Sequence, residues 1–414
     1  MARTLARLRM NLDFMPSPVA DRPGLLIRDS YNYSPATLII PPVLVEALEF
    51  FDGDRTDLDL REYLVRLTGD LEVGELAEHL ASALEEAGFL EDERYARMRE
   101  ERQREFVEAP AREAAHAGSA YPAATEPLRQ FLAGYLEGEA APSLDGLAGI
   151  AAPHVSPEGG WQCYRAAYAR LPRDWSERVF VVLGTSHYGA PDRFGLTRKP
   201  FRTPLGDAAT EVRLVDELES KAPGAILMED YCHAVEHSIE FQVVFLQQLF
   251  GPRVRILPVL CGSFARSILQ GGAPEDDENI RRLFGALGDI AAREGDRLGW
   301  VLGVDMAHMG RRYGDRFAAR AGENEMAGVK QRDHARMDRL ADGDARGFWE
   351  LVRENRDDLK WCGAAPFYTF LRVMPQARGV VERYEQWNID EQSVVSFAGM
   401  TFKIPHDPLT FSGL

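Results

Sequence analysis

The sequence predicts an α/β fold, a mostly parallel sheet flanked by helices, preceded by a small, mainly helical domain. From about residue 147, short apolar runs of strand length alternate with amphipathic stretches. The runs are LAGIAAP, RVFVVLG, RILPVLC and GWVLGVD, and helical patterns such as WQCYRAAYARL and NIRRLFGALGDIAARE separate them. Strands that alternate with helices imply a parallel sheet covered on both faces. The runs GVVERYEQWNI and SVVSFAGMTFK alternate in polarity and predict a terminal antiparallel pair.

Residues 1 to about 105 have a different pattern of apolar residues. PPVLVEALEFFDGD, DLREYLVRLTGD and VGELAEHLASALEEAGFLED place apolar residues three and four apart and predict helices. RDSYNYSPATLIIPP predicts a short hairpin, whose edge suits the addition of a peptide strand. The alternative is an accessory domain that only packs against its neighbour.

The order of these elements and the segments FFDGDRT and EEAGFLED resemble the PqqD-like winged-helix domains, which bind leader peptides or partner proteins. Between residues 51 and 100 there are 15 acidic and 6 basic residues, which does not suit DNA binding. The charged stretch ERYARMREERQREFVEAPAREA follows and predicts a solvated helix. We therefore expect a domain with its linker over 1–108 and an α/β domain over 109–414.

Charge and composition exclude several classes of function. The formal net charge of −17 disfavours nucleic acid and anionic membranes as partners. No secretory h-region is evident, and no run reaches the roughly 18 to 20 apolar residues that cross a bilayer. The four cysteines are widely spaced, which indicates thiols. We expect a cytoplasmic protein.

Histidines follow several of the predicted strands. GIAAPH ends at His154, VFVVLGTSH ends at His187, and GWVLGVDMAH contains Asp305 and His308. In open α/β sheets ligands bind beyond the carboxyl ends of the strands, so these side chains are candidates for chemistry. His237 and Cys362 add to them from the predicted starts of two helices, EHSIEFQVVFLQQL and WCGAAPFYTFLRV.

Imidazoles and a thiolate are good ligands for zinc, copper or iron. Three alternatives involve the same residues or their neighbours. His233 and His237, four apart, could form a helical metal motif; Cys362 and His237 could form a nucleophile and base pair; and Cys261 ends a strand, where packing explains it better. No GxSxG elbow, Walker A loop or GxGxxG turn is present in the sequence.

Nine segments together resemble the Memo family, in its bacterial form the AmmeMemoRadiSam system protein B family. They occur in the family's order between residues 112 and 400: REAAHAGSAYP, AAPH, LGTSHYG, FRTPLGD, EHSIEFQ, ILPVLCGS, DMAHMG, CGAAPF and VVSFAGM. The resemblance implies a fold similar to the class III extradiol dioxygenases.

The same resemblance implies a metal site of two histidines and one cysteine, which by motif match are His154, His187 and Cys362. The metal expected is iron or copper, with zinc as a further candidate. The histidine beside the site is His237, and Asp305 and His308 match a neighbouring motif. These three are the expected catalytic residues.

This chain departs from the family pattern in two places. The usual PHAGY is PHVSPEGG here, which changes the residues after His154, and the usual Ser-Ser-Asp is GVD, which removes hydroxyls next to Asp305. Both departures bear on the substrate more than on the metal.

Two functions remain open at this point. One is a metal-dependent oxidoreductase, similar to a dioxygenase, acting on an unknown small molecule or peptide. The other is a non-catalytic module that binds a peptide or protein and acts with a radical-SAM partner enzyme.

Overall fold

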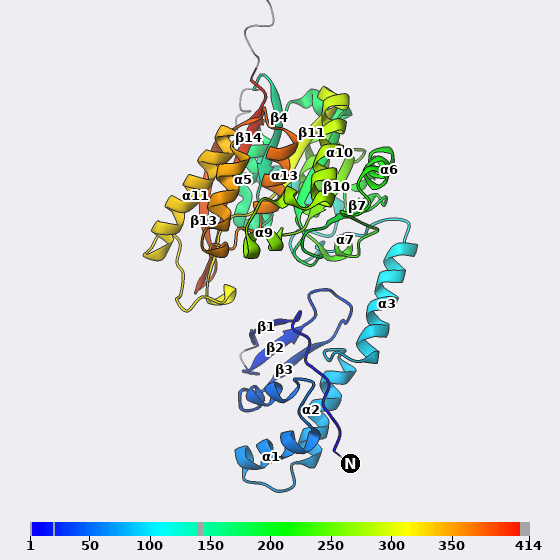
Figure 1. Cartoon of the computed structure of the whole chain (residues 1–414), viewed down its shortest axis with the longest axis vertical. Helices are drawn as coiled ribbons and strands as arrows, with labels where there is room; N and C mark the ends of the chain where they lie inside the picture. Colours follow the sequence, from blue (N-terminus) through cyan, green and yellow to red (C-terminus); the bar gives the residue numbers. More distant parts are fainter. Residues whose placement is uncertain (1, 20, 139–143, 406–414) are drawn as a thin grey trace, which may run out of the picture. The chain divides into compact units, whose positions relative to one another are not determined.

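The computed structural model of the protein describes residues 2–19, 21–138 and 144–405. The chain divides into two compact units, Met1–Ala109 and Pro110–Leu414, each labelled along its elements in Figure 1. Each unit has a hydrophobic core of its own.

The first unit contains a three-stranded antiparallel sheet of order β1-β2-β3 and a set of helices. Its strands are β1 (Asp13–Pro16), β2 (Leu25–Arg28) and β3 (Thr37–Ile40), and its α-helices are α1 (Asp57–Thr68), α2 (Gly74–Glu86) and α3 (Glu93–Glu108). The predicted helices α1 and α2 are confirmed, and α3 buries Phe106 alone among its described residues, as expected of a solvated helix.

Two predictions in this unit are wrong in detail. RDSYNYSPATLIIPP is not a hairpin by itself, because Leu25–Arg28, which begins upstream of it, pairs with Thr37–Ile40. PPVLVEALEFF forms two short 3-10 helices, η1 (Pro42–Leu44) and η2 (Glu46–Phe50), and no α-helix.

The second unit is built on an 11-stranded sheet, and the predicted fold class is confirmed. The four long central strands are mutually parallel in the order β4-β11-β5-β10, namely β4 (Leu147–Ala152), β11 (Leu298–Gly303), β5 (Val179–Thr185) and β10 (Arg255–Cys261). They are the four apolar runs of the sequence.

Shorter strands extend the sheet beyond β10, where β6 pairs antiparallel and β8 parallel with it. These strands are β6 (Phe194–Leu196), β7 (Phe201–Thr203), β8 (Gly206–Thr210) and β9 (Ile226–Met228). On the other side, β14 (Ser393–Lys403) pairs antiparallel with β4, with β13 (Arg378–Asp390) and with β12 (His308–Gly310). The predicted C-terminal antiparallel pair is therefore confirmed.

Helices cover both faces of this sheet because successive strand residues point to opposite sides. Val181 and Leu183 pack with one set of helices, whereas Phe180 and Val182 pack with the other. The first set is α6 (Val212–Lys221), α10 (Glu278–Glu294), α11 (Glu325–Asp342), α12 (Ala345–Arg353) and α13 (Ala364–Val373). The second is α4 (Thr125–Leu136), α5 (Pro157–Tyr168) and α8 (Glu240–Phe250).

The remaining helical segments are short. They are α7 (Cys232–Val235), α9 (Ala265–Gln270), η3 (Arg173–Glu177), η4 (Pro274–Asp276), η5 (Gly295–Arg297), η6 (Arg311–Tyr313) and η7 (Glu354–Arg356). Across the described residues, no helix is both long and apolar enough to cross a membrane.

Two glycines let the segment Glu236–Ile239 rest on the ends of the central strands. Gly184 of β5 and Gly303 of β11 are partners in the sheet. A Cβ atom on Gly184 would lie 2.6 Å from Ser238 Oγ, and one on Gly303 would lie 2.0 Å from the carbonyl oxygen of Ser238. His237 therefore sits at the strand ends because the sheet has no side chains at these two positions.

This packing gives a stability prediction. Gly303→Ala is expected to lower the free energy of unfolding by about 2 kcal/mol, because the new methyl group meets backbone that cannot turn aside. The matched control is Gly288→Ala in the middle of α10, where a Cβ meets nothing within 4 Å. It should raise stability by about 0.5–1 kcal/mol through helix propensity. Urea unfolding midpoints test both, and an unchanged midpoint for Gly303→Ala would contradict the close packing.

Candidate metal centre

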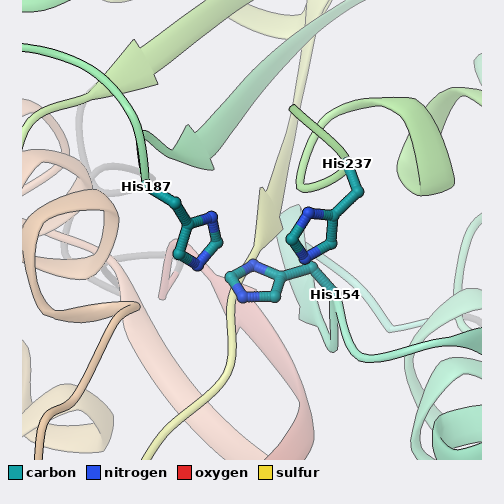
Figure 2. A group of neighbouring side chains, drawn as sticks. All are labelled: His154, His187 and His237. Carbon is teal, nitrogen blue, oxygen red and sulfur yellow. The ribbon is translucent and has the colours of Figure 1, made fainter. Parts of the chain in front are cut away.

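Three histidines from different segments meet beyond the carboxyl ends of the central strands. His154 follows β4, His187 follows β5, and His237 lies between α7 and α8 (Figure 2). One ligand nitrogen from each lies within 4.8 Å of the other two. Ring centres are 4.9 Å apart for His154 and His187 and 5.1 Å apart for His154 and His237.

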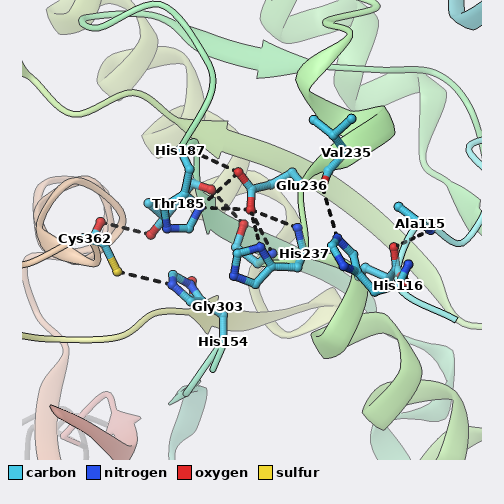
Figure 3. Close-up of polar contacts among 12 residues, drawn as sticks. Ala115, His116, His154, Thr185, His187, Val235, Glu236, His237, Gly303 and Cys362 are labelled. Carbon is cyan, nitrogen blue, oxygen red and sulfur yellow. Dashed lines mark hydrogen bonds and ion pairs between the residues drawn. The ribbon is translucent and has the colours of Figure 1, made fainter. Parts of the chain in front are cut away.

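Hydrogen bonds fix the orientation of these rings. His154 Nδ1 lies 3.0 Å from the carbonyl oxygen of Gly303, to which it donates. His187 Nδ1 lies 3.0 Å from Glu236 Oε1, and His237 Nδ1 lies 3.1 Å from the same oxygen (Figure 3). A neutral imidazole that donates through Nδ1 keeps Nε2 as its acceptor. In the neutral form, all three rings would therefore present Nε2 as the atom that can bind a metal ion.

Glu236 organises the two histidines that it contacts. Its carboxylate is 2% exposed and accepts hydrogen bonds from the backbone N–H groups of His187, His237 and Ser238, at 2.9, 2.9 and 3.2 Å. Burial raises the pKa of Glu236, but His187 and His237 outweigh it and hold that pKa well below its usual value. Burial lowers the pKa of His187, yet Glu236 and Cys362 bring it well above its usual value. Glu236 is thus a buried anion that holds two ligand rings in place.

Cys362 approaches the group from the start of α13. Its Sγ lies 3.2 Å from His154 Nε2 and 3.6 Å from the carbonyl oxygen of Asp305. Thr185 Oγ1 donates to the carbonyl oxygen of Cys362 at 3.0 Å (Figure 3). Burial raises the pKa of the thiol, and His187 opposes this rise. The thiol contacts the imidazole of His154 and interacts with that of His187, and no such contact joins it to His237, so the considered pairing of Cys362 with His237 as its base lacks support among the described residues.

The backbone that leads to Cys362 is strained. Asn355, Arg356, Asp357 and Lys360 have φ angles of +53°, +57°, +54° and +54°. Non-glycine residues in this left-handed region cost roughly 1–3 kcal/mol each. Asp357 holds the segment, because it pairs with the buried Arg336 at 3.0 Å and accepts from the Trp361 N–H at 2.9 Å.

The two other expected catalytic residues lie at the margin of the site. Asp305 Oδ1 accepts from the His154 N–H at 3.0 Å, its Oδ2 lies 3.5 Å from His154 Nε2, and burial raises its pKa to about 7. His308 lies outside the group of three histidines. Its Nδ1 contacts the carbonyl oxygens of Met306 and Lys360, and burial lowers its pKa to about 4.

The local pair His233 and His237 does not form a metal motif. His233 is buried and its Nε2 lies 3.0 Å from the carbonyl oxygen of Gly195, while α8 begins only at Glu240, beyond His237. The two rings are thus on different elements. Cys261 is packed in the core at the end of β10.

Sequence reasoning missed two residues of the site. Glu236 directly precedes His237. A carboxylate next to a candidate ligand in the sequence is the feature that could have identified Glu236 as part of the site. His116 lies with its ring centre 5.5 Å from that of His237, and its Nε2 contacts the carbonyl oxygen of Val235 at 3.0 Å. Because His116 and His237 are 121 positions apart in the sequence, no local spacing indicates this contact.

The donor set suits a transition metal. Oriented imidazoles and a thiol are ligands that zinc, copper and iron accept, and the buried Glu236 supplies the outer hydrogen bond that metal-binding histidines usually have. His154 is buried, whereas the side chains of His187 and His237 are 28% and 25% exposed. A bound ion would therefore face solvent on the side of His187 and His237.

Comparison of the sequence with known families identifies the family of this chain. The family model described as Memo-like protein matches residues 112–401, and the chain belongs to this family. The first unit lies outside the match.

Relatives extend the comparison. A MEMO1 family protein of Aquifex aeolicus is 25% identical over 93% of this chain and 97% of its own length. Similar proteins of Thermus thermophilus and Thermococcus kodakarensis are 31% and 30% identical over 70% and 64% of this chain and 82% and 88% of theirs. An uncharacterized protein of Escherichia coli K12 with a crystal structure overlaps with a TM-score of 0.32 at 13% identity, over 55% of this chain and 91% of its own, which is too slight to identify a shared fold.

The outer hydrogen bonds give a prediction. Glu236→Gln is expected to weaken metal binding about 10- to 100-fold, because an amide group cannot accept from two imidazoles and three backbone N–H groups. Titration of the metal-free protein with Cu⁺ or Fe²⁺ against a competing chelator measures this. The control is Glu158→Gln, an exposed residue in the first turn of α5. Equal affinities for wild type and Glu236→Gln would show that Glu236 does not orient the ligands.

Proposed function

We propose that this protein is a metal-dependent oxidoreductase in which His154, His187 and Cys362 hold an iron or copper ion. Zinc is the redox-inert alternative. The observation that carries the proposal is the convergence of oriented imidazole nitrogens beside a thiol, at the sheet edge where open α/β folds bind ligands. The similarity in sequence motifs to proteins that share a fold with extradiol dioxygenases supports the same reaction class.

Burial and contacts favour this ligand set. His154 is 2% exposed and its Nε2 lies 3.2 Å from Cys362 Sγ, a separation suited to two donors on one ion. His237 is the third imidazole of the group and is about as exposed as His187, so the contact of Cys362 with His154 is what favours the cysteine as the third ligand. A thiolate also selects for softer metals such as copper and iron over magnesium or calcium.

When bound, the metal would supply a Lewis-acidic and redox-active centre with an open position. The residues around it handle protons and orientation. His237 donates Nδ1–H to Glu236, so its Nε2 accepts a proton from a substrate and Glu236 stabilises the imidazolium that forms. Asp305 holds the His154 backbone, and burial keeps His308 neutral by lowering its pKa.

The proposal predicts metal loss on removing the thiol. Cys362→Ser is expected to lower the bound iron or copper from near one per chain to a small fraction, because a serine hydroxyl is a poor ligand for these ions at neutral pH. Elemental analysis of protein purified anaerobically without a histidine tag measures it. Cys261→Ser, in the core at the same sheet edge, is the control and should retain the metal. Retention by Cys362→Ser would remove the cysteine from the ligand set.

A second candidate function concerns the first unit. The Memo-like match begins at residue 112, yet the Aquifex relative aligns with 93% of the chain, so the first unit recurs beyond this protein. We propose that this unit, with its small antiparallel sheet, is a PqqD-like module that recruits a peptide or a radical-SAM partner enzyme.

One variant distinguishes the two functions. His154→Ala is expected to abolish stoichiometric metal while co-purification with a radical-SAM enzyme of the same organism stays unchanged, because His154 lies in the second unit. Elemental analysis and pull-down with the purified enzyme measure these outcomes. Unchanged metal content would remove His154 from the site.

A further inference from the structure

A concentration of positive charge follows β12. Between residues 311 and 320 the chain carries four arginines and one acidic residue, Asp315. Asp315 is already paired with Lys360 at 2.9 Å. No carboxylate within the described part of the chain forms an ion pair with any of the four, Arg311, Arg312, Arg316 and Arg320, all of which are exposed. In a chain of net charge −17 this is an uncompensated cationic segment.

The first two of these arginines share a short helix with Tyr313, which contacts His308 at the margin of the candidate metal centre. They form η6 together with Tyr313, whose ring centre lies 5.0 Å from that of His308. The backbone N–H groups of Arg311 and Arg312 donate to Gln392 and Ser393 of the β13–β14 turn, which fixes η6 on that turn. Burial raises the pKa of Tyr313, the nearby Arg312 opposes this, and the charges of Asp305 and Cys362 add to it. Tyr313 therefore joins η6 to His308 at the margin of the site.

A partly exposed apolar wall continues from His154 toward these arginines. Tyr313, Trp387 and Ile389 are half-buried and pack against the small buried cluster that contains Val155, the neighbour of His154. Trp387 lies flat on the first turn of α5, where a Cβ on Gly159 would come within 2.6 Å of its ring. Val155 and Gly159 belong to PHVSPEGG, the stretch that departs from the family pattern.

We propose that the substrate of this site is an organic anion with an apolar body. Its carboxylate or phosphate group would bind Arg311 and Arg312, and its apolar part would lie on Tyr313 and Trp387, so that its far end reaches the metal ligands. Arginine matches such oxyanions through paired hydrogen bonds, and aromatic side chains bind apolar groups with little loss of conformational freedom. Acidic residues near η6 include Asp390, whose charge acts on Tyr313, and the exposed Glu391 of the β13–β14 turn, and neither forms an ion pair with Arg311 or Arg312 among the described residues.

This inference rests on the proposed metal function only for where the reacting end of the substrate lies. The arginines and the apolar wall need no metal to bind a ligand.

The probes are 4-phenylbutyrate and its neutral analogue 4-phenylbutanamide. Calorimetry or ligand-observed NMR with metal-free and metal-loaded protein measures their affinities. The acid is expected to bind at least about tenfold more tightly than the amide, the difference that charge-assisted hydrogen bonds provide.

Substitutions test which residues bind the charged group of the ligand and which bind its apolar part. Arg311→Gln combined with Arg312→Gln should weaken binding of the acid about tenfold and leave the amide unchanged, whereas Trp387→Ala should weaken both probes. Arg253→Gln is the matched control, an exposed arginine that precedes β10 at the opposite end of the strands. It should change neither affinity.

Equal affinities for the acid and the amide, no binding of either at millimolar concentrations, or an unchanged double variant would each overturn the proposal. The metal content of the same samples is measured separately. A protein that binds no metal but prefers the acid over the amide would support the anion site and contradict the metal function. A protein that binds metal but does not prefer the acid would support the metal function and contradict the anion site.

Discussion

The buried carboxylate of Glu236 is the interaction on which the site depends. An isolated carboxylate in a protein interior is strongly disfavoured, so it persists only with enough hydrogen-bond donors around it. Glu236 has five, namely three backbone N–H groups and the Nδ1 atoms of His187 and His237. One side chain therefore joins the loop after β5 to the segment before α8, and it fixes the tautomers of two rings at the same time.

The fold brings together the histidines that this carboxylate contacts. Parallel strands bring His154 and His187 to one edge, and the bare backbone at Gly184 and Gly303 lets the segment of His237 rest there. The strained backbone before Cys362 is held by contacts outside the site, among them the Arg336–Asp357 pair. The strained backbone lowers the stability of the fold but places the Cys362 thiol at the site, as is common where a protein binds a ligand.

Much of this arrangement could be predicted from the sequence, because strand ends in a parallel sheet share an edge. That rule alone places His154, His187, Asp305 and His308 there, although His308 lies outside the group of three histidines. The rule does not extend to loops that reach the edge from elsewhere. The start of α8 was expected near Glu236, whereas the helix begins at Glu240, and the contact of His116 with His237 depends on tertiary packing.

The central claim is that two imidazoles and one thiolate hold a redox-active metal. X-ray absorption spectroscopy at the metal edge of the iron- or copper-reconstituted protein tests it most directly, because sulfur ligands lie about 0.2–0.3 Å farther from the ion than imidazole nitrogens. The account predicts one sulfur scatterer together with the multiple scattering of two imidazoles. A shell of nitrogen and oxygen without sulfur, or an ion with no imidazole signature, would contradict it.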